Sequence, residues 1–255
     1  MTARESKGPR LFVTNVRFFS ADSLGTSLLL SPEDSHYIAD VLRLRVGDPL
    51  EIGDSSGTIA RAHVTAFNES VTVTIDEILP GDTRSRPEIT LLCALCKGQK
   101  NDRICDWAAE LGCSTIIFWQ ATRSIVRVND QKDCHHKETR LSKIALAAAQ
   151  QSKQNKPPVV RVTRSLTEAV QLAPRGDAPG TAQVVCSLSA QAIPLAEIVS
   201  NTSPLTHVTL VIGPEGDITL EEEALLVSQG FVPASLGTNV LKSELAVVSA
   251  LARLV

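Results

Sequence analysis

The chain has 255 residues and a formal net charge of −3, and hydrophobic residues make up 43% of it. This length is enough for one large domain or two small ones, each with a buried core. The small negative charge argues against indiscriminate binding of polyanions, although a local basic patch could still bind nucleic acid. Because aromatic residues make up only 4% of the chain, the core must be mainly aliphatic.

Signals for membranes, secretion and metals are weak. The N-terminal residues contain no signal-peptide apolar core, and no apolar run approaches the length of a transmembrane helix. All six cysteines lie after residue 92, which favours reduced, buried thiols in a cytoplasmic protein. Cys93 and Cys96 have CxxC spacing, but both fall in a predicted apolar strand, where their side chains should diverge. We therefore expect no metal site and no membrane contact.

The first part of the chain contains short strand signals. Strands are predicted at residues 50–52, 58–67 and 71–79, and the last of these alternates apolar residues with threonine. One helix is expected to begin at Ser31 and Pro32. Residues 1–82 therefore indicate a small β-barrel domain, followed by a linker at residues 81–87.

From residue 83 to residue 255, apolar strands alternate with amphipathic helices. Strands are predicted at residues 89–95, 115–119, 184–188 and 208–212. Helices are predicted at residues 101–111, 137–152, 220–229 and 243–254. This alternation predicts an α/β domain whose mostly parallel sheet is covered on both faces.

A loop after the strand at residues 208–212 has the features of a ligand-binding loop. Its sequence is Gly213-Pro214-Glu215-Gly216-Asp217, and a helix with a capping box at Thr219 and Glu222 follows. In open α/β sheets, ligands bind at the carboxyl ends of strands, and glycines let a flat ligand approach the backbone. The two acidic residues would repel a pyrophosphate, so the loop favours a neutral or cationic ligand such as S-adenosylmethionine. An ordinary strand-to-helix turn is an equal alternative.

A second loop leads from a short strand into the apolar C-terminal helix. Ser243 is a suitable N-cap, and Lys242 and Glu244 place two charged groups beside it. A capped helix with solvated charges is the alternative interpretation. The helix itself is apolar around most of its circumference, which indicates either a homodimer interface or burial within the monomer.

Together these segments resemble the ribosomal RNA small subunit methyltransferase E family. IGPEG at residues 212–216 and SLGTNVLKSELA at residues 235–246 are similar to the family's IGPEGG and LGxRILRxETA motifs. HYIADVLRLRVGD at residues 36–48 is similar to its HxxxVLRLxxGD motif. Further elements match in the same order at residues 97–98, 110–112, 123–124 and 145–158. The resemblance covers nearly the whole chain.

The resemblance implies a PUA-like barrel that holds RNA, followed by a SPOUT domain with a C-terminal trefoil knot. Because true knots are rare, the knot is expected from the resemblance alone. It also implies S-adenosylmethionine as cofactor and a homodimer. The implied activity is methylation of a uridine at N3 in 16S ribosomal RNA of the small subunit. A SPOUT enzyme with another target, such as a ribose 2′-oxygen, and a catalytically degenerate RNA-binding protein are the alternatives.

The cofactor-binding residues are implied by the resemblance, whereas the catalytic candidates are chosen because loss of the N3 proton calls for a base and a neighbouring cation. The expected cofactor-binding residues are Leu188, Ile212, Gly213, Pro214, Glu215, Gly216, Leu236, Gly237, Val240, Leu241, Ser243 and Ala246. The catalytic candidates are Glu244 as a base, with Lys242 or Arg123 as a neighbouring cation. The expected RNA-binding residues are Arg10, Arg43, Arg45 and Lys97. Solvated surface arginines are an equal alternative, and Arg43 is favoured because it lies in the family-like VLRL segment.

The chain departs from the family's motifs at several positions. Asp217 replaces the last glycine of IGPEGG, Asn239 and Lys242 replace two arginines, and Leu245 replaces a threonine. Most of the lost groups are of the polar or basic kind that contacts RNA, and lysine lacks the bidentate geometry of arginine. The departures therefore concern substrate handling more than cofactor binding.

Overall fold

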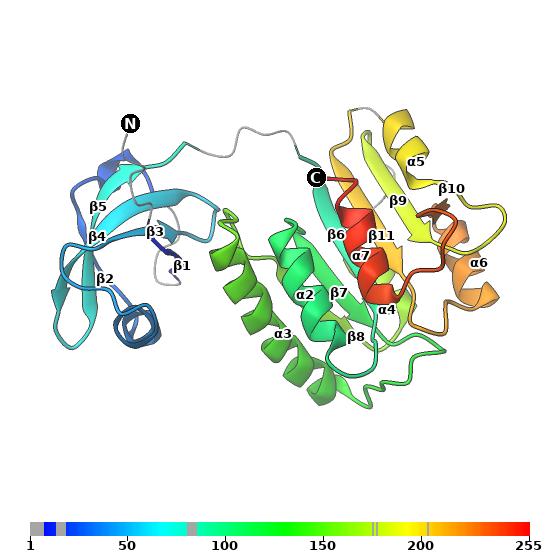
Figure 1. The fold of residues 1–255 in the computed structure, drawn as a ribbon, viewed down its shortest axis with the longest axis horizontal. Coiled ribbons are helices and arrows are strands. Elements are labelled where there is room, and N and C mark those ends of the chain that lie inside the picture. Colours follow the sequence, from blue (N-terminus) through cyan, green and yellow to red (C-terminus); the bar gives the residue numbers. More distant parts are fainter. Residues whose placement is uncertain (1–7, 14–18, 81–85, 175, 177, 203) are drawn as a thin grey trace. The chain divides into compact units, whose positions relative to one another are not determined.

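The structure is a computed structural model that describes residues 8–13, 19–80, 86–174, 176, 178–202 and 204–255. The chain forms two compact units (Figure 1). The first consists of Met1–Arg84 and Ala149–Pro157, and the second of Ser85–Ala148 and Pro158–Val255. The boundary expected between residues 82 and 83 lies outside the described residues. None of the described helices is long and apolar enough to cross a membrane.

The first unit is built on a five-stranded sheet with the order β1-β3-β4-β5-β2. Its strands are β1 (Arg10–Phe12), β2 (Ser27–Leu29), β3 (Pro49–Gly53), β4 (Ile59–Phe67) and β5 (Val71–Ile78). Neighbouring strands are antiparallel except β1 and β3. As predicted, Val71, Val73 and Ile75 are buried while the intervening threonines are half-buried. These valine and isoleucine side chains belong to an aliphatic core.

The helical segments of this unit lead into an exposed turn. A short 3-10 helix, η1, covers Ala21–Ser23. Helix α1 (Pro32–His36) begins at Ser31, whose side chain accepts a hydrogen bond from the backbone N–H of Asp34 at 3.1 Å. It continues as one π-helical turn, η2 (Tyr37–Val41). Arg43 follows in the left-handed region, at φ 54°. Such irregular backbone concentrates at functional sites, and here it is followed by exposed Arg43 and Arg45 side chains.

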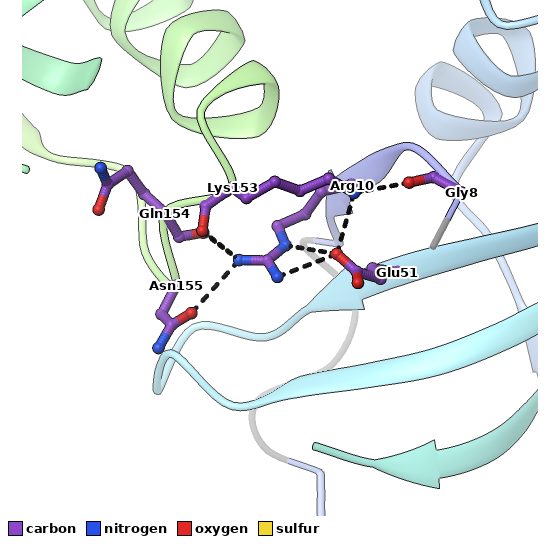
Figure 2. A network of polar contacts seen from close by, with 6 residues as sticks. All are labelled: Gly8, Arg10, Glu51, Lys153, Gln154 and Asn155. Carbon is purple, nitrogen blue, oxygen red and sulfur yellow. Dashed lines mark hydrogen bonds and ion pairs between the residues drawn. The ribbon is translucent and has the colours of Figure 1, made fainter. Parts of the chain in front are cut away.

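A buried ion network holds residues 149–157 in the first unit (Figure 2). The Glu51 carboxylate accepts hydrogen bonds from Arg10 Nε at 3.1 Å, Arg10 Nη2 at 2.9 Å and Lys153 Nζ at 3.0 Å. The remaining nitrogen of Arg10, Nη1, donates to the carbonyl oxygens of Lys153 and Gln154. A segment far away in the sequence is therefore bound to strands β1 and β3 through charged groups.

This network corrects the expectation that Arg10 contacts RNA. Its side chain is only 8% exposed, and all three guanidinium nitrogens are already hydrogen-bonded. The residue lies in β1, every residue of which is buried, beside its parallel partner Glu51 in β3. Arg10 is thus not available to a phosphate group, and its role in this structure is internal.

We expect Glu51→Gln to destabilise the first unit by about 3 kcal/mol, because it leaves a buried guanidinium without its counter-charge. Burial alone would raise the pKa of Glu51, but hydrogen bonds from Lys153 and Arg10 hold it below its ordinary value. A lowered carboxyl pKa stabilises the fold above the unfolded-state pKa, and this contribution is lost as the pH falls. Urea unfolding should therefore show the full deficit at pH 7 and a deficit that shrinks as the pH falls below about 4.5.

The matched control for this variant is Glu77→Gln, in the same sheet. Glu77 pairs with Arg61 at 2.6 Å, but its side chain is 51% exposed. An exposed ion pair contributes about 1 kcal/mol or less. Equal losses of stability from the two variants would contradict a special role for the buried network.

The second unit contains a seven-stranded sheet in which every neighbouring pair is parallel. The order is β10-β12-β9-β11-β6-β7-β8. The strands are β6 (Glu88–Ala94), β7 (Thr115–Trp119), β8 (Val159–Thr163), β9 (Thr181–Cys186), β10 (Ile193–Pro194), β11 (His207–Ile212) and β12 (Val232–Ser235). The predicted α/β class with a mostly parallel sheet is confirmed.

Helices cover both faces of this sheet. They are α2 (Lys100–Glu110), α3 (Gln131–Gln151), α4 (Leu166–Leu172), α5 (Leu195–Asn201), α6 (Leu220–Ser228) and α7 (Ser243–Leu251). One face packs against α2, α3, α5 and α7 through a core that includes Ile104, Leu141, Leu195 and Val247. The other face packs against α4 and α6 through Leu166 and Leu226. Figure 1 shows α7 beside α2, in front of β6 and β11.

Helix α7 is buried mainly within its own unit. Its apolar residues Ala246, Val247, Ala250 and Leu251 all belong to the core. Burial within the monomer, one of the two alternatives, therefore accounts for most of its apolar circumference, and Leu245 is left 51% exposed. The homodimer stays a prediction. The helix begins at Ser243 with Lys242 as N-cap, one residue earlier than the expected cap.

Candidate functional site

The topology of the second unit brings several strand ends to one edge of the sheet. Strands β12, β9, β11 and β6 are parallel neighbours, so their carboxyl ends lie together. The chain leaves β6 for its neighbour β7 on one side and, after β11, continues to β12 on the other side. Such a change of direction creates the crevice in which open α/β sheets bind ligands.

A pocket of about 280 Å³ lies at this edge. Most of the residues in three segments line it: 186–188 after β9, 212–217 after β11, and 234–246 from β12 to the first turn of α7. All residues expected to bind a cofactor line it except Gly216: they are Leu188, Ile212, Gly213, Pro214, Glu215, Leu236, Gly237, Val240, Leu241, Ser243 and Ala246. The sequence analysis missed Cys186, Ser187, Ala234 and Ser235, which lie at the ends of β9 and β12.

The pocket combines apolar side chains with charged groups that are mostly acidic. Leu188 and Val240 line it and are 61% and 76% exposed, which is unusual for aliphatic side chains. Glu215 and Asp217 contribute carboxylates, and Lys242 contributes one ammonium group. These walls suit a ligand that has a flat apolar part and a positive charge, and they are unfavourable for a phosphate.

Asp217 shows why one departure from the family motif is tolerated. It has φ 62°, in the left-handed region, where glycine is the favoured residue and aspartate is among the better alternatives. Its Oδ1 accepts a hydrogen bond from the backbone N–H of Ile218 at 2.8 Å. The residue therefore keeps the loop conformation that a glycine would adopt, while it adds a charge to the pocket.

The two glycines of this loop are required by its packing. A Cβ atom on Gly213 would lie 3.0 Å from Cγ2 of Ile218, and one on Gly216 would lie 3.2 Å from Cβ of Arg123. Both contacts are tighter than most real Cβ contacts. Larger residues at these positions would therefore disturb the loop itself, besides any effect on a ligand.

Arg123 and its neighbour Thr122 hold the segment between β11 and α6. Arg123 Nη1 donates to the carbonyl oxygens of Gly216 at 3.1 Å and Ile218 at 3.3 Å. Thr122 donates through its backbone N–H and its hydroxyl to Glu222 Oε1. Glu222 also completes the predicted capping box with Thr219 at the start of α6. Arg123 therefore supports the pocket loop, and its catalytic role stays a prediction.

Glu244 lies in the first turn of α7, immediately after the pocket-lining Ser243. Its side chain is 15% exposed, and its Oε2 is buried without a hydrogen-bond partner among the described residues. This oxygen lies 3.5 Å from Lys100 Nζ. The same ammonium group is 2.9 Å from Glu215 Oε1, which also accepts a hydrogen bond from the backbone N–H of Lys97. The sequence analysis singled out Lys97, whose side chain is exposed, and missed Lys100.

The two cysteines of the CxxC segment lie closer together than predicted. Strand β6 ends at Ala94, so Cys96 lies beyond the strand and the rule of alternating faces does not apply to it. The thiols of Cys93 and Cys96 interact, and this hydrogen bond, together with burial, raises the pKa of Cys93 well above its usual range. Within the described part of the chain, no group of three or more His, Cys, Asp or Glu side chains is placed to hold a metal ion.

Comparison with known proteins agrees with this geometry. Residues 83–255 match the RNA methyltransferase domain family, and residues 30–76 match the PUA domain of RNA methyltransferases. The chain belongs to the RNA methyltransferase family. Ribosomal RNA small subunit methyltransferase E of Bacillus subtilis is a relative of this RNA methyltransferase, 29% identical over 223 residues and covering 87% of each chain. The protein of the same name from Synechocystis is 25% identical over 98% of this chain and 80% of its own length.

Solved structures also resemble this RNA methyltransferase over nearly its full length. A ribosomal RNA small subunit methyltransferase E from Neisseria gonorrhoeae, bound to S-adenosyl methionine, has a TM-score of 0.81 and 26% identity, and the match covers 96% of each chain. A putative methyltransferase from Legionella pneumophila, in complex with the same cofactor, has a TM-score of 0.80, 26% identity and 97% coverage of each chain.

We expect Asp217→Gly to leave the stability and the loop conformation intact, because glycine adopts φ near 60° without strain. Asp217→Val should destabilise the protein by about 1–2 kcal/mol, because a β-branched residue is strained in this region. Thermal unfolding of both variants measures the difference. A valine variant as stable as the glycine variant would show that the loop adopts another conformation.

Proposed function

We propose that this RNA methyltransferase transfers a methyl group from S-adenosylmethionine to ribosomal RNA, and that its target is N3 of a uridine in 16S ribosomal RNA of the small subunit. The main support is the likeness, over 96% of the chain or more, to two structures that contain S-adenosylmethionine. The curated relatives from Bacillus subtilis and Synechocystis are both named ribosomal RNA small subunit methyltransferase E. The finer assignment to uridine N3 comes from the motif resemblance.

The residues of the pocket fit such a cofactor. Leu188 and Val240 offer exposed apolar surface for a flat base, and Leu236 and Gly237 bring backbone to the same pocket. When bound, S-adenosylmethionine supplies an electrophilic methyl group on a positively charged sulfur. The carboxylates of Glu215 and Asp217 would give that positive charge a favourable environment.

The residues beside the pocket supply the groups that methylation at N3 requires. N3 of uracil carries a proton that must leave as the new N–C bond forms, and negative charge develops on the flanking carbonyl oxygens. Glu244, in the first turn of α7 and next to the pocket-lining Ser243, is the proposed acceptor of the proton. Lys242, which lines the pocket, and Arg123 are the cations proposed to stabilise the charge on the carbonyl oxygens.

The proposed activity is tested on small ribosomal subunits that lack the modification. Incubation with the protein and S-adenosylmethionine should produce N3-methyluridine in 16S ribosomal RNA, detected by mass spectrometry of nucleosides. Glu244→Gln keeps the shape of the side chain and removes its charge. It should slow turnover by about 10²–10⁴, the range of a general base, while cofactor affinity and melting temperature change little.

The outcomes separate the alternatives. A methyl group on a ribose 2′-oxygen would establish a different target atom, and the absence of both product and cofactor binding would leave only an RNA-binding protein. Near-normal turnover of the Glu244→Gln variant would remove Glu244 from the mechanism. Ser249→Ala, at a partly exposed residue of α7 that does not line the pocket, controls for nonspecific effects on this helix.

We propose that RNA binds mainly to the first unit, through Arg43 and Arg45, with Lys97 as a contact near the pocket. The first two side chains are exposed on the turn that follows the π-helical segment. Arginines in this setting form ion pairs with phosphates and release counterions. Arg43 adopts a left-handed backbone conformation, which is energetically unfavourable for a residue with a side chain. A functional role of this turn would explain why the conformation is kept.

We expect the double variant Arg43→Ala, Arg45→Ala to bind ribosomal RNA more weakly and with a shallower salt dependence. Two lost phosphate contacts should reduce the slope of log K against log salt by roughly 1.4, at about 0.7 per contact for single strands. Filter binding at several salt concentrations measures this slope. Lys132→Ala, an exposed lysine of the second unit, is the control, and an unchanged slope in the double variant would exclude the arginines.

A further inference from the structure

Lys100 connects three segments of the second unit that are far apart in the sequence. It is the first residue of α2, after the carboxyl end of β6. Its ammonium group forms ion pairs with Glu215, in the loop after β11, and with Glu244, in the first turn of α7. The Lys100 side chain is 27% exposed, so these contacts are only partly screened by water.

Two carboxylates therefore share one cation. Burial alone would raise the pKa of Glu215, but the hydrogen bond from Lys100 and backbone N–H groups, including that of Lys97, hold it below its ordinary value. The pKa of Lys100 is raised, chiefly by its hydrogen bond with Glu215. Lys100 and Glu215 are thus both ionised at neutral pH, and Lys100 is also the counter-charge nearest the buried oxygen of Glu244.

We infer that Lys100 is a positioning residue of the methyl-transfer site: its ammonium group is the shared counter-charge of Glu215 and Glu244 and holds their carboxylates in one fixed arrangement. This inference rests on the proposed function. It assigns Lys100 no contact with the RNA or the cofactor. Its effect passes through Glu215, which lines the pocket, and through Glu244, the proposed base.

Other charged or titratable groups surround the two carboxylates. They are Cys93, Cys96 and the exposed Lys97 from β6 and the turn that follows it, Asp217 from the loop after β11, and the exposed Lys242 before α7. Among the side chains that the structure describes here, that of Lys100 alone forms ion pairs with both carboxylates. Its charge is therefore not duplicated by a neighbour.

Removal of this cation should affect ligands of different charge differently. Without Lys100, the two carboxylates would repel each other and disturb the loop, which weakens binding of any ligand. S-adenosylmethionine carries a positive sulfur, which would partly replace the missing charge, whereas the sulfur of S-adenosylhomocysteine is neutral. A purely structural role of Lys100 predicts equal weakening of both ligands.

The test compares Lys100→Met, Lys100→Arg and Arg103→Met by calorimetry with both ligands. Arg103 is an exposed residue of α2 outside the pocket. At pH 7.5, Lys100→Met should weaken the binding of S-adenosylhomocysteine at least about tenfold, the equivalent of one pKa unit of interaction. It should weaken the binding of S-adenosylmethionine clearly less. Lys100→Arg and Arg103→Met should keep the wild-type ratio of the two dissociation constants. Without Lys100, burial raises the pKa of Glu215, so at pH 5 this carboxylate should begin to take up a proton, and the ratio for Lys100→Met should move toward that of the wild type.

Equal weakening of the binding of both ligands by Lys100→Met, or no weakening, would overturn the inference.

If the wild type binds neither ligand, the proposed function fails, and melting temperatures then test Lys100 alone. Because the folded-state pKa of Glu215 is lowered, its stabilisation exists above the unfolded-state pKa and disappears as the pH falls. Lys100→Met should therefore melt below the wild type at pH 7.5, and the difference should shrink as the pH falls below about 4.5. A pH-independent difference would refute the charge role. Lys100→Gln replaces the methionine variant if the latter does not fold.

Discussion

The register of β11 against its two neighbours decides where the groups of the pocket lie. Ile212 is paired with Cys93 of β6, and Val211 with Val185 of β9. Because side chains alternate between faces, a slip of one residue would exchange the buried faces of β11 and move its loop away from Lys100. Both faces of this strand are packed, through Leu210 toward one layer of helices and Val211 toward the other. The register is therefore fixed by core packing, and the charged contacts at the strand ends depend on it.

The two units contain three-membered charge networks of opposite composition. In the first unit, two cations, Arg10 and Lys153, share the carboxylate of Glu51, which is 3% exposed. In the second unit, two carboxylates share the ammonium group of Lys100. The first network is almost fully internal and binds a remote segment to the sheet, so its charges serve the fold. The second lies beside the pocket, where its excess negative charge would stabilise a bound cationic ligand.

The sequence predicted those features that depend on local pattern. The alternation of Val71, Val73 and Ile75, the capping box at Thr219 and the glycine loop after β11 were all visible in the residues themselves. It did not predict β1, β8 or the return of residues 149–157 to the first unit. These features depend on pairing and charge over long distances, for example between Arg10 and Lys153, for which no local signal exists. Lys100 was missed for the same reason, since its two partners lie more than 100 residues away. The trefoil knot stays a prediction, because strand order and pairing do not describe how the chain is threaded.

The departures from the family motifs divide according to exposure. Asp217 keeps the backbone conformation of the glycine that it replaces, so the loop is preserved. Asn239, Lys242 and Leu245 are all exposed at or beside the rim of the pocket. The internal contacts, from Lys100 to Glu215 and Glu244, involve none of these positions. Substitutions at these exposed positions can therefore alter contacts with the RNA without disturbing the ion pairs of Lys100. It follows that the affinity and selectivity for the RNA substrate can change in this chain while the ion pairs of Lys100 are retained, because those ion pairs involve none of the exposed positions.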